Sequence, residues 1–234
     1  MKQLDPRLLT AASLVREHAV FADIGCDHGH LSIYLMQQRH AQRGYACDIK
    51  SGPLSKAQAN LAAAGLSQQV PTRLTDGLTG LDGCGITDVV IAGMGGEVIL
   101  QILDASALVR DPSVRLILQP QSREFLLRRY LLEHGFSILT ETAVFSGRFS
   151  YTVLCAQYAG APGPDAQDPY RWYAGLLPQA DSPAAADKLI RTAVHLEDRS
   201  HGVPDPQQAA QFTQLAARLR QDAAQILARC PASC

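Results

Sequence analysis

Short apolar segments alternate with amphipathic segments from the start of the chain to Gly135. The apolar runs are continuous rather than alternating, which is typical of strands buried on both faces. They predict strands, some ending in a turn, over 20–25, 44–49, 70–78, 88–96 and 114–120. Apolar positions spaced three or four residues apart predict helices over 7–18, 30–40, 53–66, 97–106 and 123–135. Strands that alternate with such helices indicate an α/β fold with a mostly parallel sheet.

The pattern changes after Gly135. Two strand-like runs, 136–147 and 149–158, are separated by a short turn, which permits only antiparallel pairing. A linker rich in Gly, Pro and Asp follows at 160–169. Beyond it we predict two helices, 183–200 and 205–229. The second has a narrow coiled-coil-like apolar seam, formed by Phe212, Leu215, Leu219, Ala223 and Ile226.

These patterns divide the chain into an α/β domain over 1–159 and a linker with a helical hairpin over 160–234. The hairpin either packs on the main domain alone or binds a substrate or partner.

Composition narrows the class of protein only slightly. The chain is 47% hydrophobic and 18% charged, which is typical of a globular domain. A formal net charge of -1 gives no overall argument for a nucleic acid or a membrane, although a local basic patch is compatible with it. Six scattered cysteines without a Cys-x-x-Cys pair indicate reduced thiols in a cytoplasmic protein and no metal site. We expect no signal segment and no membrane span.

The first predicted strand ends in a Gly-rich loop, Asp23-x-Gly25-x-Asp27-x-Gly29. Open α/β sheets bind nucleotides at such a turn. The dinucleotide fingerprint would place glycine at position 27, where the backbone approaches a pyrophosphate. A carboxylate there disfavours NAD and favours a cationic ligand such as S-adenosylmethionine. A turn without a ligand is the alternative.

Later strand ends carry further candidates. Asp48 follows the second strand at the distance at which an acid binds ribose hydroxyls, or it caps the next helix. Asp76-Gly77 can accept a hydrogen bond from an adenine amine, or it only forms a turn. The three glycines of Gly93-Met94-Gly95-Gly96 either leave a slot for a flat base or form a tight turn.

The stretches ADIGCDHGHL, DGL, DVVIAGMGGEVI and LILQPQS together resemble the bacterial tRNA (adenine-N1)-methyltransferases that modify adenine 22 in the D-arm. The likeness in motifs covers roughly residues 20–155. It implies a Rossmann-like class I methyltransferase domain, S-adenosylmethionine as cofactor, tRNA as partner and a C-terminal helical region. The C-terminal segment itself has no sharp motif, and no feature of the sequence indicates the oligomeric state.

The resemblance also implies residue roles. Cofactor binding is expected of Asp23, Gly25, Asp27, Gly29, Asp48, Ile49, Asp76, Gly77 and Gly93. Catalytic roles are expected of Asp27, His28 and Met94, although His28 could simply begin a helix. Gln119 and Pro120 are expected to line the same cleft.

Arginines are the expected contacts to RNA phosphates. The candidates are Arg7, Arg16, Arg123, Arg128, Arg129 and Arg148, each of which could instead be a solvated surface charge. Three other functions stay open at this point: a small-molecule methyltransferase, an NAD-dependent dehydrogenase, and a non-enzymatic module whose helical hairpin binds a partner.

Overall fold

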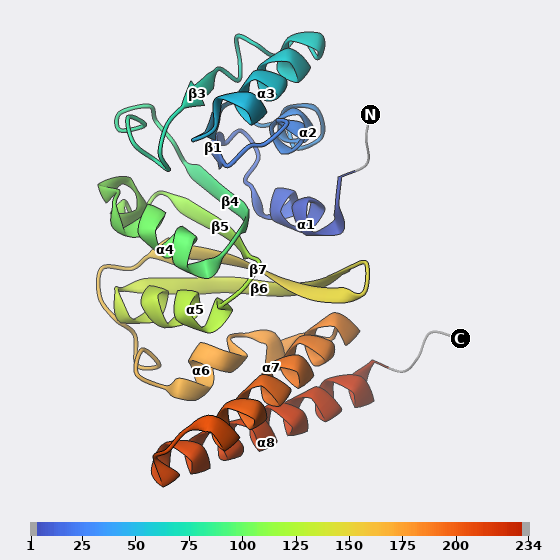
Figure 1. Cartoon of the computed structure of the whole chain (residues 1–234). Coiled ribbons are helices and arrows are strands. Elements are labelled where there is room, and N and C mark those ends of the chain that lie inside the picture. The colour runs from blue at the N-terminus through green and yellow to red at the C-terminus, as the bar shows by residue number, and fades with distance from the viewer. Residues whose placement is uncertain (1–3, 231–234) are drawn as a thin grey trace.

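A computed structural model of the chain describes residues 4–230. Seven strands form one sheet in the order β3-β2-β1-β4-β5-β7-β6 (Figure 1). The strands are β1 (Val20–Ile24), β2 (Arg43–Asp48), β3 (Thr72–Leu74), β4 (Asp88–Met94), β5 (Arg115–Pro120), β6 (Phe136–Ser146) and β7 (Phe149–Tyr158). The first five are parallel, and β7 pairs antiparallel with both β5 and β6. The predicted parallel sheet that ends in an antiparallel hairpin is confirmed.

Helices cover both faces of the sheet, and a separate group of helices lies beside β6 (Figure 1). The α-helices are α1 (Pro6–Leu14), α2 (His30–Gln38), α3 (Ser51–Ala63), α4 (Gly96–Asp104), α5 (Glu124–Glu133), α6 (Pro169–Ala174), α7 (Pro183–Gly202) and α8 (Pro206–Arg229). Two short 3-10 helices are η1 (Ala107–Arg110) and η2 (Leu177–Gln179). The sequence pattern did not predict α6, η1 or η2.

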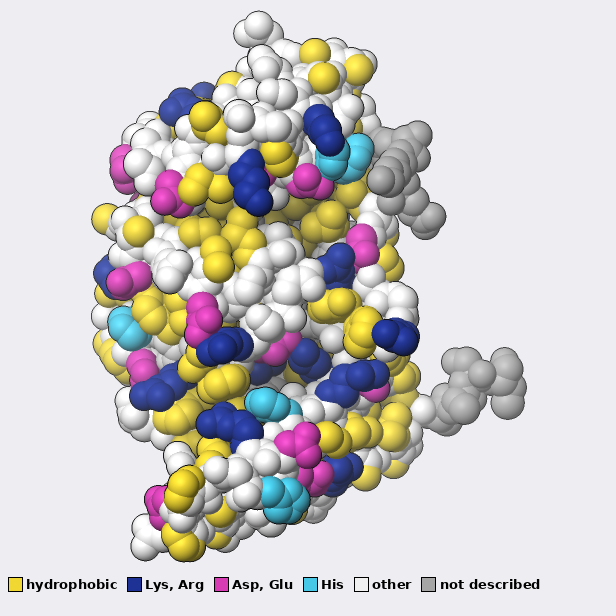
Figure 2. All heavy atoms as spheres, in the orientation of Figure 1, with side chains coloured by type: hydrophobic (Ala, Val, Ile, Leu, Met, Phe, Trp, Pro, Cys, Tyr) yellow, Lys and Arg dark blue, Asp and Glu magenta, His cyan; other side chains and the backbone are white. Residues whose placement is uncertain are grey.

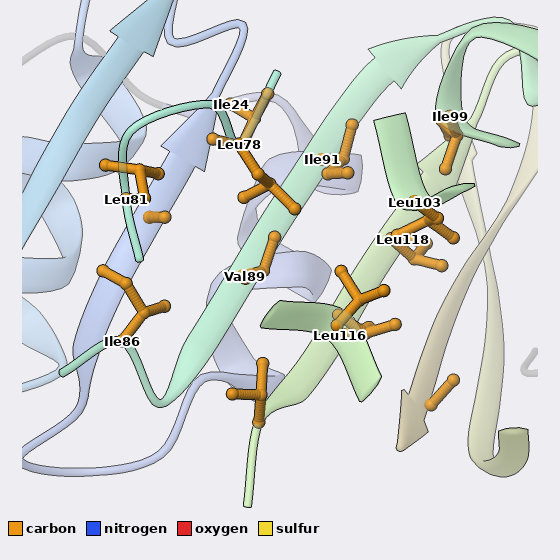
Figure 3. Packing of buried hydrophobic residues seen from close by; sticks show 14 of the residues in the cluster. Ile24, Leu78, Leu81, Ile86, Val89, Ile91, Ile99, Leu103, Leu116 and Leu118 are labelled. Atoms are coloured by element: carbon orange, nitrogen blue, oxygen red, sulfur yellow. The ribbon is translucent and has the colours of Figure 1, made fainter. Parts of the chain in front are cut away.

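Successive side chains of a strand point to opposite faces of the sheet, so alternate residues of the central strands pack into two different cores. On one face, Ile24, Val89, Ile91, Leu116 and Leu118 pack against α4 and the loop before β4 (Figure 3). On the other face, the intervening residues, among them Phe21, Val90 and Ile117, pack against α1, α2 and α3. Burial on both faces explains why these strands are continuous apolar runs.

The helical region after the linker has a core of its own. Helices α6, α7 and α8 pack together, and Ala143 of β6 belongs to the same cluster. The predicted seam of α8 is largely correct, because Phe212, Leu219, Ala223 and Ile226 are buried. Leu215 is only partly buried and Ala216 takes its place in the core. The helical region thus packs on the edge of the α/β domain.

Candidate active site

The turn from β1 into α2 is built from residues with positive φ. Gly25, Asp27 and Gly29 have φ of 74°, 49° and 71°, a region that glycine adopts without strain. The backbone N–H groups of Gly25 and Cys26 both donate to the carbonyl of Cys47, each at 2.9 Å. The loop is therefore pinned to the end of β2.

The two glycines of this turn have different reasons to be glycine. A Cβ atom on residue 25 would lie 2.3 Å from the Cε atom of Met94. A Cβ atom on residue 29 would lie 3.2 Å from the Cβ atom of Ala57 in α3. Gly25 therefore borders the cleft, whereas the buried Gly29 permits the packing of α2 against α3.

Two hollows meet at Gly25, which lines both. We call the first, of about 410 Å³, the β2–β3 hollow; it is lined in part by Asp48, Ile49, Asp76, Gly77 and Met94. We call the second, of about 360 Å³, the β1–β4 hollow; it is lined in part by Arg7, Asp23, Asp27, His28, Gly93 and Gln119. Most of the predicted site residues thus face one of two adjoining concavities at the carboxyl ends of the strands.

Three of the four acidic residues of the predicted site lie beside the Gly25 turn and differ in environment; the fourth, Asp76, is exposed in the β2–β3 hollow. Asp23 is buried, accepts a hydrogen bond from Ser32 Oγ at 2.7 Å, and burial raises its pKa to about 6. Asp48 is half-buried; its carboxylate accepts from the backbone N–H of Lys50 at 2.9 Å and of Asp27 at 3.3 Å. The Asp27 carboxylate is exposed, and its Oδ1 lies 3.5 Å from His28 Nε2. Asp27 is therefore the one of the three whose charge meets the open cleft.

The end of β4 is irregular where the two hollows meet. The register with β5 shifts between Ala92 and Met94, and Gly93 has φ of 80°. The N–H of Gly93 donates to the side chain of Gln119 at 3.1 Å. Gln119 is 1% exposed, so this bond fixes the irregularity from inside. Such bulges re-aim residues beside active sites, and here the irregularity lies directly before Met94, whose side chain packs against Gly25.

The candidate RNA-binding arginines are not gathered at one place. Arg7 on α1 lines the β1–β4 hollow and lies over the Tyr151 ring at 4.7 Å. Arg123 precedes α5 and pairs with Glu97 at 2.6 Å. Arg148 lies in the β6–β7 turn over Phe149, at 5.0 Å. Arg129 lies over Trp172 of α6, at 4.8 Å.

Two of the predicted arginine contacts are wrong. Arg16 lies beyond the end of α1, pairs with Asp88 at 2.9 Å, and thereby binds the opposite, amino-terminal end of β4. Arg128 is 2% exposed and forms an ion pair with the buried Glu141. Neither guanidinium can reach a phosphate without breaking a structural ion pair.

Several lining residues were not predicted. Leu8 and Gln121 line the β1–β4 hollow, and Val98 and Ile102 line the β2–β3 hollow. Gln121 is part of the LILQPQS stretch, but only Gln119 and Pro120 were assigned to the cleft. The helical positions of Val98 and Ile102 gave no signal, because an apolar residue on α4 is equally suited to the core.

The described residues contain no group of three or more His, Cys, Asp or Glu arranged to hold a metal ion. No helix within residues 4–230 has the length and apolar character to cross a membrane.

Comparison with known proteins agrees with this geometry. A family model described as "Methyltransferase domain" matches residues 4–154. With the strand order and the cleft at Gly25, it defines the chain as a Rossmann-like methyltransferase. The tRNA (adenine(22)-N(1))-methyltransferase of Bacillus subtilis is 32% identical over 155 residues. The alignment covers 66% of this chain and 65% of that protein, so it spans slightly less than two thirds of the relative.

Solved structures extend the likeness to the helical region. A Streptococcus pneumoniae protein described as "a putative tRNA (m1A22) methyltransferase" has a TM-score of 0.79 and is 30% identical, with 96% of this chain and 100% of that chain covered. Its complex with S-adenosyl-L-methionine gives a TM-score of 0.77 over the same shares. The Bacillus subtilis M1A22 tRNA methyltransferase, at 26% identity, has a TM-score of 0.79 over 97% and 100% of the two chains. The chain belongs to the tRNA (adenine(22)-N1)-methyltransferase family.

Proposed function

We propose that the protein transfers a methyl group from S-adenosylmethionine to N1 of an adenine in tRNA, at position 22 of the D-arm. The observation that carries the proposal is the pair of hollows that meet at Gly25 and Met94. The β2–β3 hollow suits a nucleoside cofactor, and the β1–β4 hollow suits a target base. The full-length likeness to a structure solved with S-adenosyl-L-methionine supports the same division.

The residues present fit this cofactor. The β2–β3 hollow has a volume within the range of small-molecule sites, about 300–1,000 Å³. The half-buried Asp48 carboxylate can accept hydrogen bonds from ribose hydroxyls, and Asp76 can accept one from an adenine amine. Because Gly25 has no Cβ atom, the end of Met94 lies directly against the loop backbone at the wall of the cleft. Asp23 and Asp27 line the adjoining hollow, where acidic groups favour a ligand with a positive charge.

S-adenosylmethionine supplies an electrophilic methyl group on a sulfonium centre when it is bound. Adenine N1 has a lone pair in the ring plane, so the chain does not have to remove a proton before attack. The protein then has mainly to align the base with the methyl group, and such positioning lowers the activation barrier by roughly 7–11 kcal/mol. Met94 and the Gly93 irregularity form the wall at which the two ligands meet.

The Asp27 carboxylate has a separate role in this proposal. N1-methylation leaves the adenine ring with a positive charge, and a fixed carboxylate stabilises that charge as it develops. Asp27 is exposed at the cleft and is held by its own N–H, which donates to Asp48. His28, next to Asp27 in the same hollow, is a second polar group for the base edge.

The target base has to leave any pairing, because N1 lies on the pairing edge. Gly93-Met94-Gly95-Gly96 replaces the Asn/Asp-Pro-Pro-Tyr/Phe turn of enzymes that methylate exocyclic amines. That difference favours a ring nitrogen as acceptor.

A tRNA substrate also implies a cytoplasmic location, where the cysteines of the protein stay reduced.

The test is methylation of unmodified tRNA transcripts with methyl-labelled S-adenosylmethionine, followed by digestion and mass analysis of the labelled nucleoside. Label in N1-methyladenosine is expected, and a transcript with guanine in place of adenine 22 is expected to lose it. Label in the variant transcript would contradict the assignment of adenine 22 as the methylated base. Cofactor binding by calorimetry with no labelled transcript would indicate another acceptor, such as a small molecule.

A further inference from the structure

A groove of about 550 Å³ lies outside the cleft, between α5 and the helical region. Its walls include five aromatic side chains, Phe125, Tyr170, Trp172, Tyr173 and Phe212. The rings of Phe125 and Tyr173 stack at 5.1 Å with 15° between their planes. Several of these rings also fill the core of the helical region, but Trp172 and Phe125 are only half-buried. Trp172 and Phe125 are therefore the two rings that present part of their surface to a ligand in the groove.

Three arginines cover the rings of this groove. Arg218 lies 3.4 Å from the centre of the Tyr170 ring, Arg199 lies 4.5 Å from that of Phe212, and Arg129 lies over Trp172. Arg129 also pairs with Glu133. Within residues 4–230, neither Arg199 nor Arg218 has a carboxylate partner.

The acidic side chain that lines the groove is already engaged. Asp168 accepts the backbone N–H of Tyr170 at 2.9 Å and thereby caps α6. Arg218 is exposed on α8. The groove thus combines two arginines that form no ion pair in the described part of the chain with partly exposed aromatic rings, which is the chemistry that binds the phosphates and bases of single-stranded nucleic acid.

A third hollow, of about 350 Å³, adjoins the groove on the side of α7. Phe125 and Tyr173 line both the groove and this hollow. Ser122 also lines this hollow, and it directly follows Gln121 of the β1–β4 hollow in the sequence. Lys188, Arg191 and His195 of α7 line it as well. Figure 2 shows Lys and Arg side chains gathered over the half of this face that contains α5 and the helical region.

We propose that this aromatic groove is a second RNA subsite, which binds an unpaired nucleotide of the substrate away from the methylated adenine. The base stacks on the half-buried Trp172, and the phosphates lie against Arg199 and Arg218. The third hollow, which Lys188 and Arg191 line, carries the backbone on the side of the cleft. The inference rests on the RNA substrate of the proposed function, and it assigns a binding role to α6 and α8.

The chain contains a single tryptophan, so the fluorescence of Trp172 reports on the groove directly. The experiment titrates the full-length protein with an unmodified tRNA transcript and with a short oligoadenylate, at low and high salt. Saturable quenching that weakens at high salt is expected. Arg218→Ala is expected to weaken the RNA affinity by about tenfold, because one phosphate loses its cationic partner.

Arg220→Ala is the matched control, because Arg220 lies two residues further on the same helix, outside the groove, and pairs with Glu197 at 2.7 Å. Circular dichroism melting verifies that both variants fold. In the methylation assay, Arg218→Ala is expected to raise KM for tRNA while kcat and the affinity for S-adenosylmethionine stay unchanged.

Different outcomes separate this proposal from the proposed function. Methylation of tRNA without quenching of Trp172, or equal effects of Arg218→Ala and Arg220→Ala, would overturn the subsite alone. Quenching by polyglutamate but not by RNA would overturn it in favour of an acidic protein partner. Quenching by RNA that Arg218→Ala weakens supports the subsite, even if no adenine in the transcript is methylated.

Discussion

The buried ion pair between Arg128 and Glu141 joins the helical region to the α/β domain. Arg128 Nε donates to Glu141 Oε1 at 2.9 Å, and its Nη1 donates to the carbonyls of Trp172 and Tyr173, both at 3.2 Å. The other oxygen of Glu141 accepts the N–H of Leu176 at 2.9 Å. One guanidinium thus holds α5, β6 and α6 together.

Arg128→Met is expected to lower the free energy of unfolding by roughly 3–5 kcal/mol, because Glu141 is left buried without its cation. That loss is a large part of the stability of an ordinary domain, about 5–15 kcal/mol. Arg128→Met with Glu141→Leu is expected to recover much of the loss, since no buried charge remains.

The assay is urea unfolding followed by circular dichroism and, in parallel, by Trp172 fluorescence, because Trp172 lies beside the pair. Arg191→Ala is the control; its exposed pair with Asp187 is expected to contribute less than about 1 kcal/mol. If Arg128→Met unfolds within about 1 kcal/mol of the wild type, or if the double variant is no more stable than the single one, the reasoning is refuted.

Three further predictions concern the cleft. Asp27→Ala is expected to lower kcat by about 10–100-fold in single-turnover methylation, because the developing charge loses its carboxylate; an unchanged rate would remove Asp27 from the mechanism. The pKa of Asp23 is about 6 in the folded protein and about 3.9 when unfolded, so the folded state binds the proton more tightly. The free energy of unfolding should therefore fall by up to about 3 kcal/mol as the pH rises from about 4 to 6, and urea titrations of Asp23→Asn should lack this slope. Gly25→Ala should cost only about 1–2 kcal/mol of stability through its positive φ. It should nevertheless weaken S-adenosylmethionine binding in calorimetry by about tenfold, because the end of Met94 must move; a wild-type affinity would show that Gly25 does not border the cofactor.

The order of elements and most of the cleft could be predicted because both are local in the sequence. Strands buried on both faces leave continuous apolar runs, and the site of such a sheet lies where those strands end. Asp48, Asp76 and Gly93 were identified in this way, and the structure brings them to two adjoining hollows.

What could not be predicted depends on contacts distant in the sequence. The sequence around Arg128 predicts an exposed charge, because its partner Glu141 belongs to another element. Gly29 reads as a ligand-facing glycine, and only the packing of α3 shows that Ala57 is its neighbour. Helix α6 has only six residues; it is held by the Asp168 cap and by tertiary packing of its aromatic rings, neither of which has a helical period to detect.

The helical region has a second consequence, apart from RNA binding, because it packs against β6 at the edge of the sheet. β6 is an edge strand of eleven residues, and such a strand can template pairing with another chain. Helix α7 and η2 pack against it, and the N–H of Leu176 binds its Glu141 side chain (Figure 1). A chain cut after residue 159 would lose this shield. We therefore expect removal of α6–α8 to leave β6 as an uncovered edge, open to pairing with a second copy of the domain.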